Sequence, residues 1–118
     1  MAGRLVHFEI GAENADRAQG FWSGVFGWDV GAPMSPEMDY RMFQTSDQQG
    51  GAIFPSDDLG NLRVYFDTED VEATRAKIQE LGGQAEEKMP GLGYGWFAGC
   101  RDTEGNAFSL WQSDESAS

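Results

Sequence analysis

The chain has 118 residues, of which 40% are hydrophobic and 13% aromatic, and its formal net charge is −12. This length and composition indicate a single globular domain with a real core, and they exclude a disordered chain. The excess of 20 acidic over 8 basic residues argues against nucleic acid and anionic membranes as partners, because few cations are available to neutralise phosphates. A cationic small molecule is compatible with this charge, although solubility explains it more simply.

The first predicted element is a strand over residues 4–10, which alternates in a period of two. One face carries Leu5, His7 and Glu9, and the other carries Val6, Phe8 and Ile10. Asn14 is placed to cap a helix over residues 15–26, and Gly27 to end it. Trp22 and Trp28 are predicted to lie in the core. Further strands are predicted over residues 28–30, 40–45 and 51–54, with a loop over 31–38.

A short junction over residues 55–61 leads into the second half. A strand is predicted over 62–67, and Asp70 caps a helix over 71–81 that ends at Gly82-Gly83. Strands are predicted over 84–88, 96–101 and 107–112, with a glycine-rich loop over 89–95 and a flexible polar tail over 113–118. Cys100, the sole cysteine, is predicted to be a buried apolar residue. Because the start of the sequence leads into a strand pattern without a signal peptide, we expect a cytoplasmic protein.

The two halves therefore repeat one pattern, β-α-β-β-β. Each half has only about fifty residues, which is marginal for independent folding. We predict an α+β fold in which a single domain, residues 1–118, is built from two modules, residues 4–56 and 61–112, that pack together. A ligand is expected in the cleft between the modules.

Three local patterns resemble the vicinal oxygen chelate superfamily, the group of glyoxalase I, extradiol dioxygenases, fosfomycin-resistance enzymes and bleomycin-resistance proteins. They are the strand of residues 6–10 followed by residues 15–18, the aromatic pattern of residues 21–28, and the turn of residues 102–108, with Thr103 where the family usually has proline. The resemblance implies a curled, eight-stranded mixed sheet around a cleft, and commonly a homodimer.

The resemblance also implies four inward positions that hold a divalent cation in the family's metalloenzymes. Here those positions are His7, Phe54, Arg63 and Ser109. His7 is an ordinary ligand, whereas phenylalanine cannot coordinate a metal and arginine is a permanent cation. Glu9 adds at most one oxygen, and enzymic sites usually need three or more protein ligands. We therefore predict no metal and no cofactor, and an enzymatic role is disfavoured, because the chemistries named above use the metal as a Lewis acid.

The cleft predicted in this way is rich in aromatic residues and methionine and holds a few polar groups, which is typical of a small-molecule site. Its candidate ligand-binding residues are His7, Glu9, Tyr40, Phe54, Arg63, Tyr65, Trp96, Ser109 and Trp111. Of these, Tyr40 and Trp96 are expected to close over the cleft from the loops. Arg63 either binds an anionic group of the ligand or pairs internally with Glu9 or Asp67. His7 is either a structural hydrogen-bonding residue or a general base.

Three functions remain open on this basis. The first is a metal-free protein that binds an aromatic or amphipathic molecule, with bleomycin-resistance proteins as the analogy. The second is a metal-independent, or atypical metal-dependent, lyase, isomerase or dioxygenase-like enzyme that acts on a small metabolite with His7 and Glu9 as acid and base. The third is a subunit or regulatory module whose cleft is vestigial.

Overall fold

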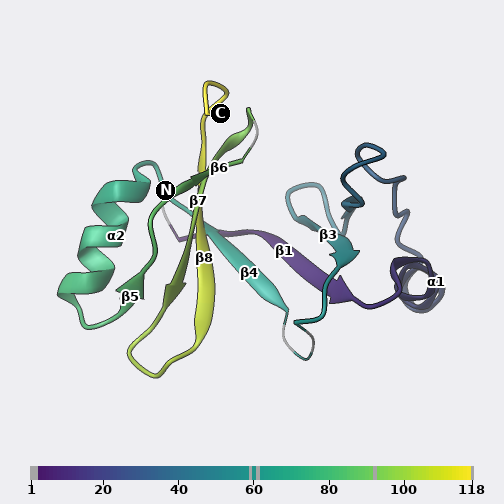
Figure 1. Ribbon diagram of the computed structural model, residues 1–118, viewed down its shortest axis with the longest axis horizontal. Coiled ribbons are helices and arrows are strands. Elements are labelled where there is room, and N and C mark those ends of the chain that lie inside the picture. Colours follow the sequence, from purple (N-terminus) through teal and green to yellow (C-terminus); the bar gives the residue numbers. More distant parts are fainter. Residues whose placement is uncertain (1–2, 59, 61, 92, 118) are drawn as a thin grey trace. The chain divides into compact units, whose positions relative to one another are not determined.

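The structure, a computed structural model, describes residues 3–58, 60, 62–91 and 93–117. The chain forms two compact units (Figure 1). We call Val6–Arg63 the first module, and Val64–Ser118 together with Met1–Leu5 the second module. The described residues contain two helices and eight strands of a mixed sheet, so the predicted α+β class is confirmed. The predicted order β-α-β-β-β is matched only approximately, because the first half has the order β-α-β-β and the second has β-α-β-β-β-β.

The part of the first module that the structure describes contains one helix and three strands. They are β1 (Leu5–Ala12), α1 (Ala15–Phe26), β2 (Arg41–Gln44) and β3 (Gly50–Pro55). The strand order is β2-β3-β1. β3 pairs with β1 in parallel and with β2 antiparallel. A parallel pair needs a long crossover connection, and α1 lies within that connection.

The ends of α1 are those that the sequence predicts. The side chain of Asn14 accepts a hydrogen bond from the backbone N–H of Arg17 at 3.0 Å, which satisfies one of the free N–H groups of the first turn. Gly27 ends the helix at a φ of 73°, a left-handed conformation that glycine adopts without steric cost.

The core of the first module lies between α1 and one face of its strands. Ile10, Phe43 and Ile53 are buried there, and Trp22 and Trp28 pack against them, as predicted. The Trp28 ring stacks on Trp22 at 5.3 Å and on Phe43 at 4.6 Å between centroids. The strand predicted over residues 28–30 is wrong, because the apolar residues of this segment pack by their side chains and the segment pairs with no strand.

The second module has a longer antiparallel part. Its elements are β4 (Arg63–Asp67), α2 (Val71–Glu80), β5 (Gln84–Ala85), β6 (Met89–Pro90), β7 (Gly95–Arg101) and β8 (Ala107–Ser113). The strand order is β4-β8-β7-β5, and β6 also pairs with β7. β4 and β8 are parallel, and β7 is antiparallel to its partners.

The core of the second module lies between α2 and one face of β7 and β8. Val71, Ala98, Cys100 and Leu110 are buried in it, so the prediction that Cys100 is a buried apolar residue is confirmed. Burial raises the pKa of the Cys100 thiol, which makes this residue a poor nucleophile. The side chain of Asp70 caps α2 by accepting from the N–H of Ala73 at 3.0 Å.

Two segments of the second module differ from expectation. The strand predicted over residues 84–88 is limited to Gln84–Ala85, and Arg75 donates hydrogen bonds to the carbonyls at positions 85 and 86. The carbonyls at positions 85 and 86 are therefore satisfied by a helix side chain in place of a longer strand ladder. The second difference is that the glycine-rich loop predicted over residues 89–95 contains the short strand β6.

The predicted flexible tail, residues 113–118, begins inside β8 and continues as a turn over residues 114–116. The N–H of Asp114 donates to the carbonyl of Tyr94 at 2.9 Å, and the N–H of Gly93 donates to Ala117 at 2.6 Å. Ala117 is buried. In the described residues, neither helix has the length and apolar character needed to cross a membrane.

Candidate functional site

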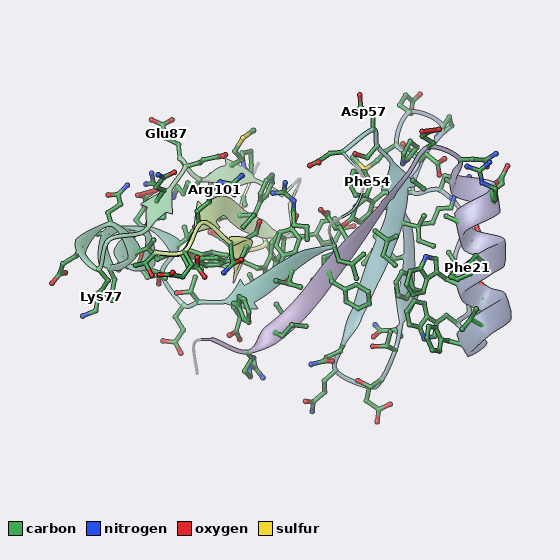
Figure 2. The ribbon with its side chains drawn as sticks, turned by 90° about the horizontal axis from the view of Figure 1, so that it is seen from below. Phe21, Phe54, Asp57, Lys77, Glu87 and Arg101 are labelled. Carbon is green, nitrogen blue, oxygen red and sulfur yellow. The ribbon has the colours of Figure 1, made fainter. Side chains whose placement is uncertain are left out.

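The candidate site lies on the face of the first module's sheet that is turned away from α1. His7 and Glu9 alternate with Phe8 and Ile10 along β1, and the latter pair faces the helix-side core. In the parallel register, Glu9 stands opposite Ala52 and Gly11 opposite Phe54, so these β3 residues share the face of His7 and Glu9. We call this surface the His7 face. Figure 2 shows α1 along one side of these strands and labels Phe54 on β3.

The hydroxyl of Tyr40 connects the two polar side chains of the His7 face. Its oxygen lies 2.6 Å from Oε2 of Glu9 and 2.7 Å from Nε2 of His7. A carboxylate only accepts hydrogen bonds, so the single hydroxyl proton is donated to Glu9 and Nε2 of His7 must be the donor to Tyr40. Of the two neutral tautomers of His7, the network therefore selects the one with its proton on Nε2. We call these three residues the Tyr40 triad.

Aromatic rings surround the Tyr40 triad. The rings of His7 and Tyr40 are stacked with centroids 6.2 Å apart, and those of Tyr40 and Phe54 are tilted at 6.1 Å. His7, Tyr40 and Phe54 are each partly buried, and Ala52 is fully buried beside them. A few hydrogen-bonding groups held among aromatic carbons is the usual composition of a small-molecule site.

Burial lowers the pKa of His7, and the negative charge of Glu9 opposes this effect only in part. The lowered pKa favours the neutral form of the imidazole at pH 7. Because the unfolded chain binds a proton more readily than the folded chain, the free energy of unfolding rises with pH. The relevant window lies between the lowered pKa of the folded state and the ordinary value of 6.5.

A His7→Gln variant tests this electrostatic description. We expect the variant to lose the part of the pH dependence that falls in the window just described, because glutamine does not titrate. The measurement is urea unfolding of both proteins from pH 5 to pH 8. The same pH dependence in both proteins would contradict a lowered pKa of His7.

The structure brings together four of the predicted ligand-binding residues, namely His7, Glu9, Tyr40 and Phe54. The role of Tyr40 was only partly predicted. The sequence places it near the cleft as a residue closing over it, whereas the structure makes it the link between His7 and Glu9. These residues are 31 and 33 positions away from Tyr40, and no local pattern in the sequence signals such a pairing.

Three of the other predicted residues share a face of the second module. Tyr65 stands opposite Ser109 in the parallel register, and Trp111 follows two residues later on β8. Tyr65 and Ser109 are buried, with exposed fractions of 7% and 0%. The indole of Trp111 lies over the glycine-rich segment, where a Cβ atom on Gly91 or Gly95 would come within 2.8 Å or 2.7 Å of the ring. Glycine at these positions allows the backbone to approach the indole.

Trp96 does not share the face of Ser109 and Trp111. In the register of β7 and β8, the side chain of Trp96 lies on the opposite face of the sheet from theirs, and it packs against the core on the α2 side. Its indole N–H donates to Asp114 at 3.1 Å, and the ammonium of Lys88 lies 4.2 Å from its ring centroid. The expectation that Trp96 closes over the predicted site as a loop residue is wrong, since it belongs to β7 and its face is set by strand alternation.

Asp67 has a partner that the sequence did not indicate. The backbone N–H and the side chain of Arg4 donate to its carboxylate at 2.8 Å and 2.9 Å, and these bonds lower the pKa of Asp67. This contact uses the carboxylate that was one of two candidate partners for Arg63. An internal pair of Arg63 with Glu9 stays a prediction.

The residues at the superfamily's four metal positions do not fit a divalent cation. Phe54 has no donor atom, Arg63 carries a positive charge, and Ser109 is fully buried. Within the described ranges, no group of three or more His, Cys, Asp or Glu residues is placed to hold a metal. His7 and Glu9 are two potential ligands, and the hydroxyl of Tyr40 is hydrogen-bonded to both.

Comparison with known proteins gives a consistent assignment. The model of the glyoxalase-like domain family matches residues 7–111. A glyoxylase-like domain-containing protein of Didymella fabae is 28% identical over 92% of this chain and 92% of its own length. The anthracycline biosynthesis protein DnrV of Streptomyces peucetius is 25% identical over 93% of this chain, which spans 47% of that protein.

A solved structure, the methylmalonyl-CoA epimerase of Streptomyces coelicolor, has the same fold. Its TM-score is 0.66 at 20% identity, covering 100% of this chain and 99% of the other. At this identity the likeness concerns the fold. Because the family model spans nearly all of both modules, the chain belongs to the glyoxalase-like domain family and has the vicinal oxygen chelate fold.

Proposed function

We propose that this protein binds a small aromatic or amphipathic molecule on the His7 face of the first module, without a catalytic metal. The observation that carries the proposal is the Tyr40 triad, in which His7 and Glu9 are bridged by one phenol hydroxyl next to the Phe54 ring. The expectation that the ligand also contacts the second module stays a prediction, as does the homodimer.

The chemistry of the triad indicates what such a ligand would carry. The rings of His7, Tyr40 and Phe54 offer contact area to a flat apolar group. The carboxylate of Glu9 is a hydrogen-bond acceptor, and a ligand with a hydroxyl or amine donor has complementary chemistry. An anthracycline, the compound class in the name of the Streptomyces peucetius relative, has a fused aromatic ring system with such groups and fits this description.

Native mass spectrometry of the purified protein tests the proposal directly. We expect an aromatic compound either to be retained from the host or to bind from a panel that includes daunorubicin as a probe. The same spectra report whether the species is a dimer. Binding that is weakened by Tyr40→Phe and unchanged by Tyr94→Phe supports the site. Equal binding to both variants would place the ligand elsewhere, and no binding of any panel compound would contradict the proposal.

A second function, acid–base catalysis, is favoured by the tautomer of His7. A proton taken from a substrate carbon by Nδ1 would break the C–H bond, form an N–H bond and leave an imidazolium. Glu9 stabilises that cation through the Tyr40 hydroxyl, as a carboxylate orients and stabilises a catalytic histidine. The electron pair of the broken C–H bond would stay on the substrate as a delocalised carbanion. Return of the proton, on the same face, to another carbon of that carbanion would complete an isomerisation.

Exchange of substrate hydrogen with solvent deuterium distinguishes catalysis from binding. Panel compounds with an acidic C–H bond are incubated in deuterium oxide with the protein and followed by NMR. Exchange that is lost in His7→Gln and slowed in Glu9→Gln supports an enzyme. Binding without exchange leaves the binding protein as the function.

A further inference from the structure

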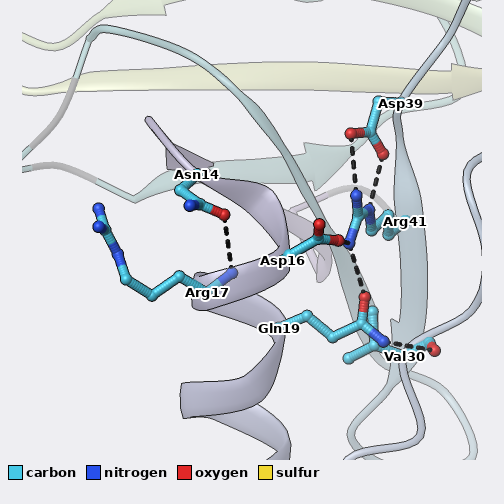
Figure 3. Close-up of polar contacts among 7 residues, drawn as sticks. All are labelled: Asn14, Asp16, Arg17, Gln19, Val30, Asp39 and Arg41. Atoms are coloured by element: carbon cyan, nitrogen blue, oxygen red, sulfur yellow. Dashed lines mark hydrogen bonds and ion pairs between the residues drawn. The ribbon is translucent and has the colours of Figure 1, made fainter.

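Tyr40 is flanked by two oppositely charged residues whose side chains bond to each other. Nε of Arg41 donates to Oδ1 of Asp39 at 2.7 Å, and Nη2 donates to Oδ2 at 3.1 Å (Figure 3). This pair of parallel bonds closes a short ring around the backbone of Tyr40. A bidentate arginine–carboxylate pair fixes orientation as well as distance.

The same guanidinium is anchored to α1. Nη1 of Arg41 donates to Oδ1 of Asp16 at 2.7 Å and to Oε1 of Gln19 at 2.9 Å (Figure 3). Gln19 in turn donates to the carbonyl of Val30 at 3.4 Å. The Arg41 side chain is only 12% exposed. We call this set of contacts around Arg41 the Arg41 clamp.

The clamp and the Tyr40 triad lie on opposite faces of the same sheet. β2 begins at Arg41, which stands opposite Ile53 in the register and is turned towards α1. Tyr40 precedes it, outside the strand ladder, and its side chain reaches His7 and Glu9 on the other face. The regular ladder of β2 therefore does not fix the backbone of Tyr40, and the clamp lies where such a restraint is needed.

We propose that Arg41 is a positioning residue for the site: by holding Asp39 and α1 at once, it fixes the backbone of Tyr40 so that the hydroxyl bridges His7 and Glu9. The expected effect of Arg41 on ligand affinity rests on the proposed function. The effect of Arg41 on Tyr40 does not rest on the proposed function, and it can be measured without a ligand. A residue on the α1 side would thus set the geometry of a binding surface that it does not touch.

Lysine at position 41 would keep the charge and lose the geometry. A guanidinium offers five donors in a rigid fork, whereas an ammonium is a point charge on a flexible stem. Arg41→Lys should therefore break the two parallel bonds to Asp39 while preserving attraction to the acidic residues. We expect the Tyr40 ring to become mobile and water to reach His7.

His7 is the sole histidine of the chain, so its NMR signals report on the triad without ambiguity. We expect Arg41→Lys to reproduce most of the change in imidazole ¹⁵N shifts and in His7 pKa that Tyr40→Ala produces. In both variants the pKa of His7 should rise towards its ordinary value, because burial is the main cause of its lowering. Asp39→Asn, which removes the carboxylate charge of the pair, should act in the same direction and serves if Arg41→Lys does not fold.

Arg75→Lys is the matched control. Arg75 is also a little-exposed guanidinium, at 16%, that bonds to a carboxylate, Glu72, and to backbone carbonyls, but it lies in the second module. We expect this control to lose a similar free energy of unfolding without moving the signals of His7. His7 signals that move equally in both variants would indicate a general loss of stability, and signals that move in neither would show that Arg41 does not position Tyr40. Either result would overturn the proposal.

A double variant separates positioning from a direct electrostatic effect. In the Tyr40→Ala background, Arg41→Lys should cause no further change at His7, because the residue through which Arg41 acts is absent. A shift that persists in this background would overturn the positioning role.

If a ligand is found, Arg41→Lys should raise its Kd about tenfold, which corresponds to weakening one hydrogen-bonded contact. Failure to find any ligand would contradict the proposed function and leave the NMR result standing.

Discussion

Replacing Tyr40 by phenylalanine is expected to lower the free energy of unfolding by about 1.5–3 kcal/mol, the range for hydrogen bonds that involve a charged group. The variant keeps the ring, its stacking on His7 and its contact with Phe54, and removes only the hydroxyl that lies 2.6 Å from Glu9. Urea unfolding at pH 7 measures the loss. If a ligand is identified, its affinity should fall as well, because the acceptors on His7 and Glu9 are no longer held together.

Tyr94→Phe is the matched control for this prediction. Tyr94 is 63% exposed, and exposed substitutions of this kind usually change stability by less than about 0.5 kcal/mol. A Tyr40→Phe variant as stable as the control would show that the bridging bonds contribute nothing in solution. The triad would then be a crowded group of side chains and not an organised site.

Most of the fold could be predicted from the sequence because its signals are local. The alternation along residues 4–10, the caps at Asn14 and Asp70 and the stop at Gly27 each depend on a few neighbouring residues. The failures are short segments whose structure is decided by contacts with distant residues. Residues 28–30 look like a strand because the apolar Trp28 and Val30 alternate with Asp29, but the stacking of Trp28 on Trp22 and Phe43 decides their structure.

The candidate site was predictable only in part, for a related physical reason. Strand alternation placed His7 and Glu9 on one face, and the resemblance to the superfamily implied that Phe54 lies beside them. The position of Tyr40 depends on the clamp of Arg41 with Asp39 and α1, which joins residues far apart in sequence. Trp96 lies at the start of β7. The face of the sheet on which its side chain lies could not be predicted there, because an uncertainty of one residue in the strand register moves a side chain to the opposite face.

Ile53→Ala is expected to cause the largest loss of stability, about 2–5 kcal/mol, which is the range for deleting a buried branched side chain. Ile53 is completely buried at the centre of β3, opposite Ile10 on β1 and Arg41 on β2. Truncating it leaves a cavity among the side chains of β1, β2 and α1 that close packing prevents from collapsing. Thermal and urea unfolding of the variant measure the loss.

Val25→Ala is the control, because Val25 is 55% exposed on α1 and alanine is the better helix former. We expect it to change stability by less than about 0.5 kcal/mol.

The Ile53 variant also tests whether the site depends on the core beneath it. Since Ile53 supports Arg41 on one neighbouring strand and Glu9 lies next to Ile10 on the other, a loosened core should shift the NMR signals of His7. An Ile53→Ala variant that loses stability while the His7 signals stay unchanged would show that the Arg41 clamp, and not the core, holds Tyr40 in place.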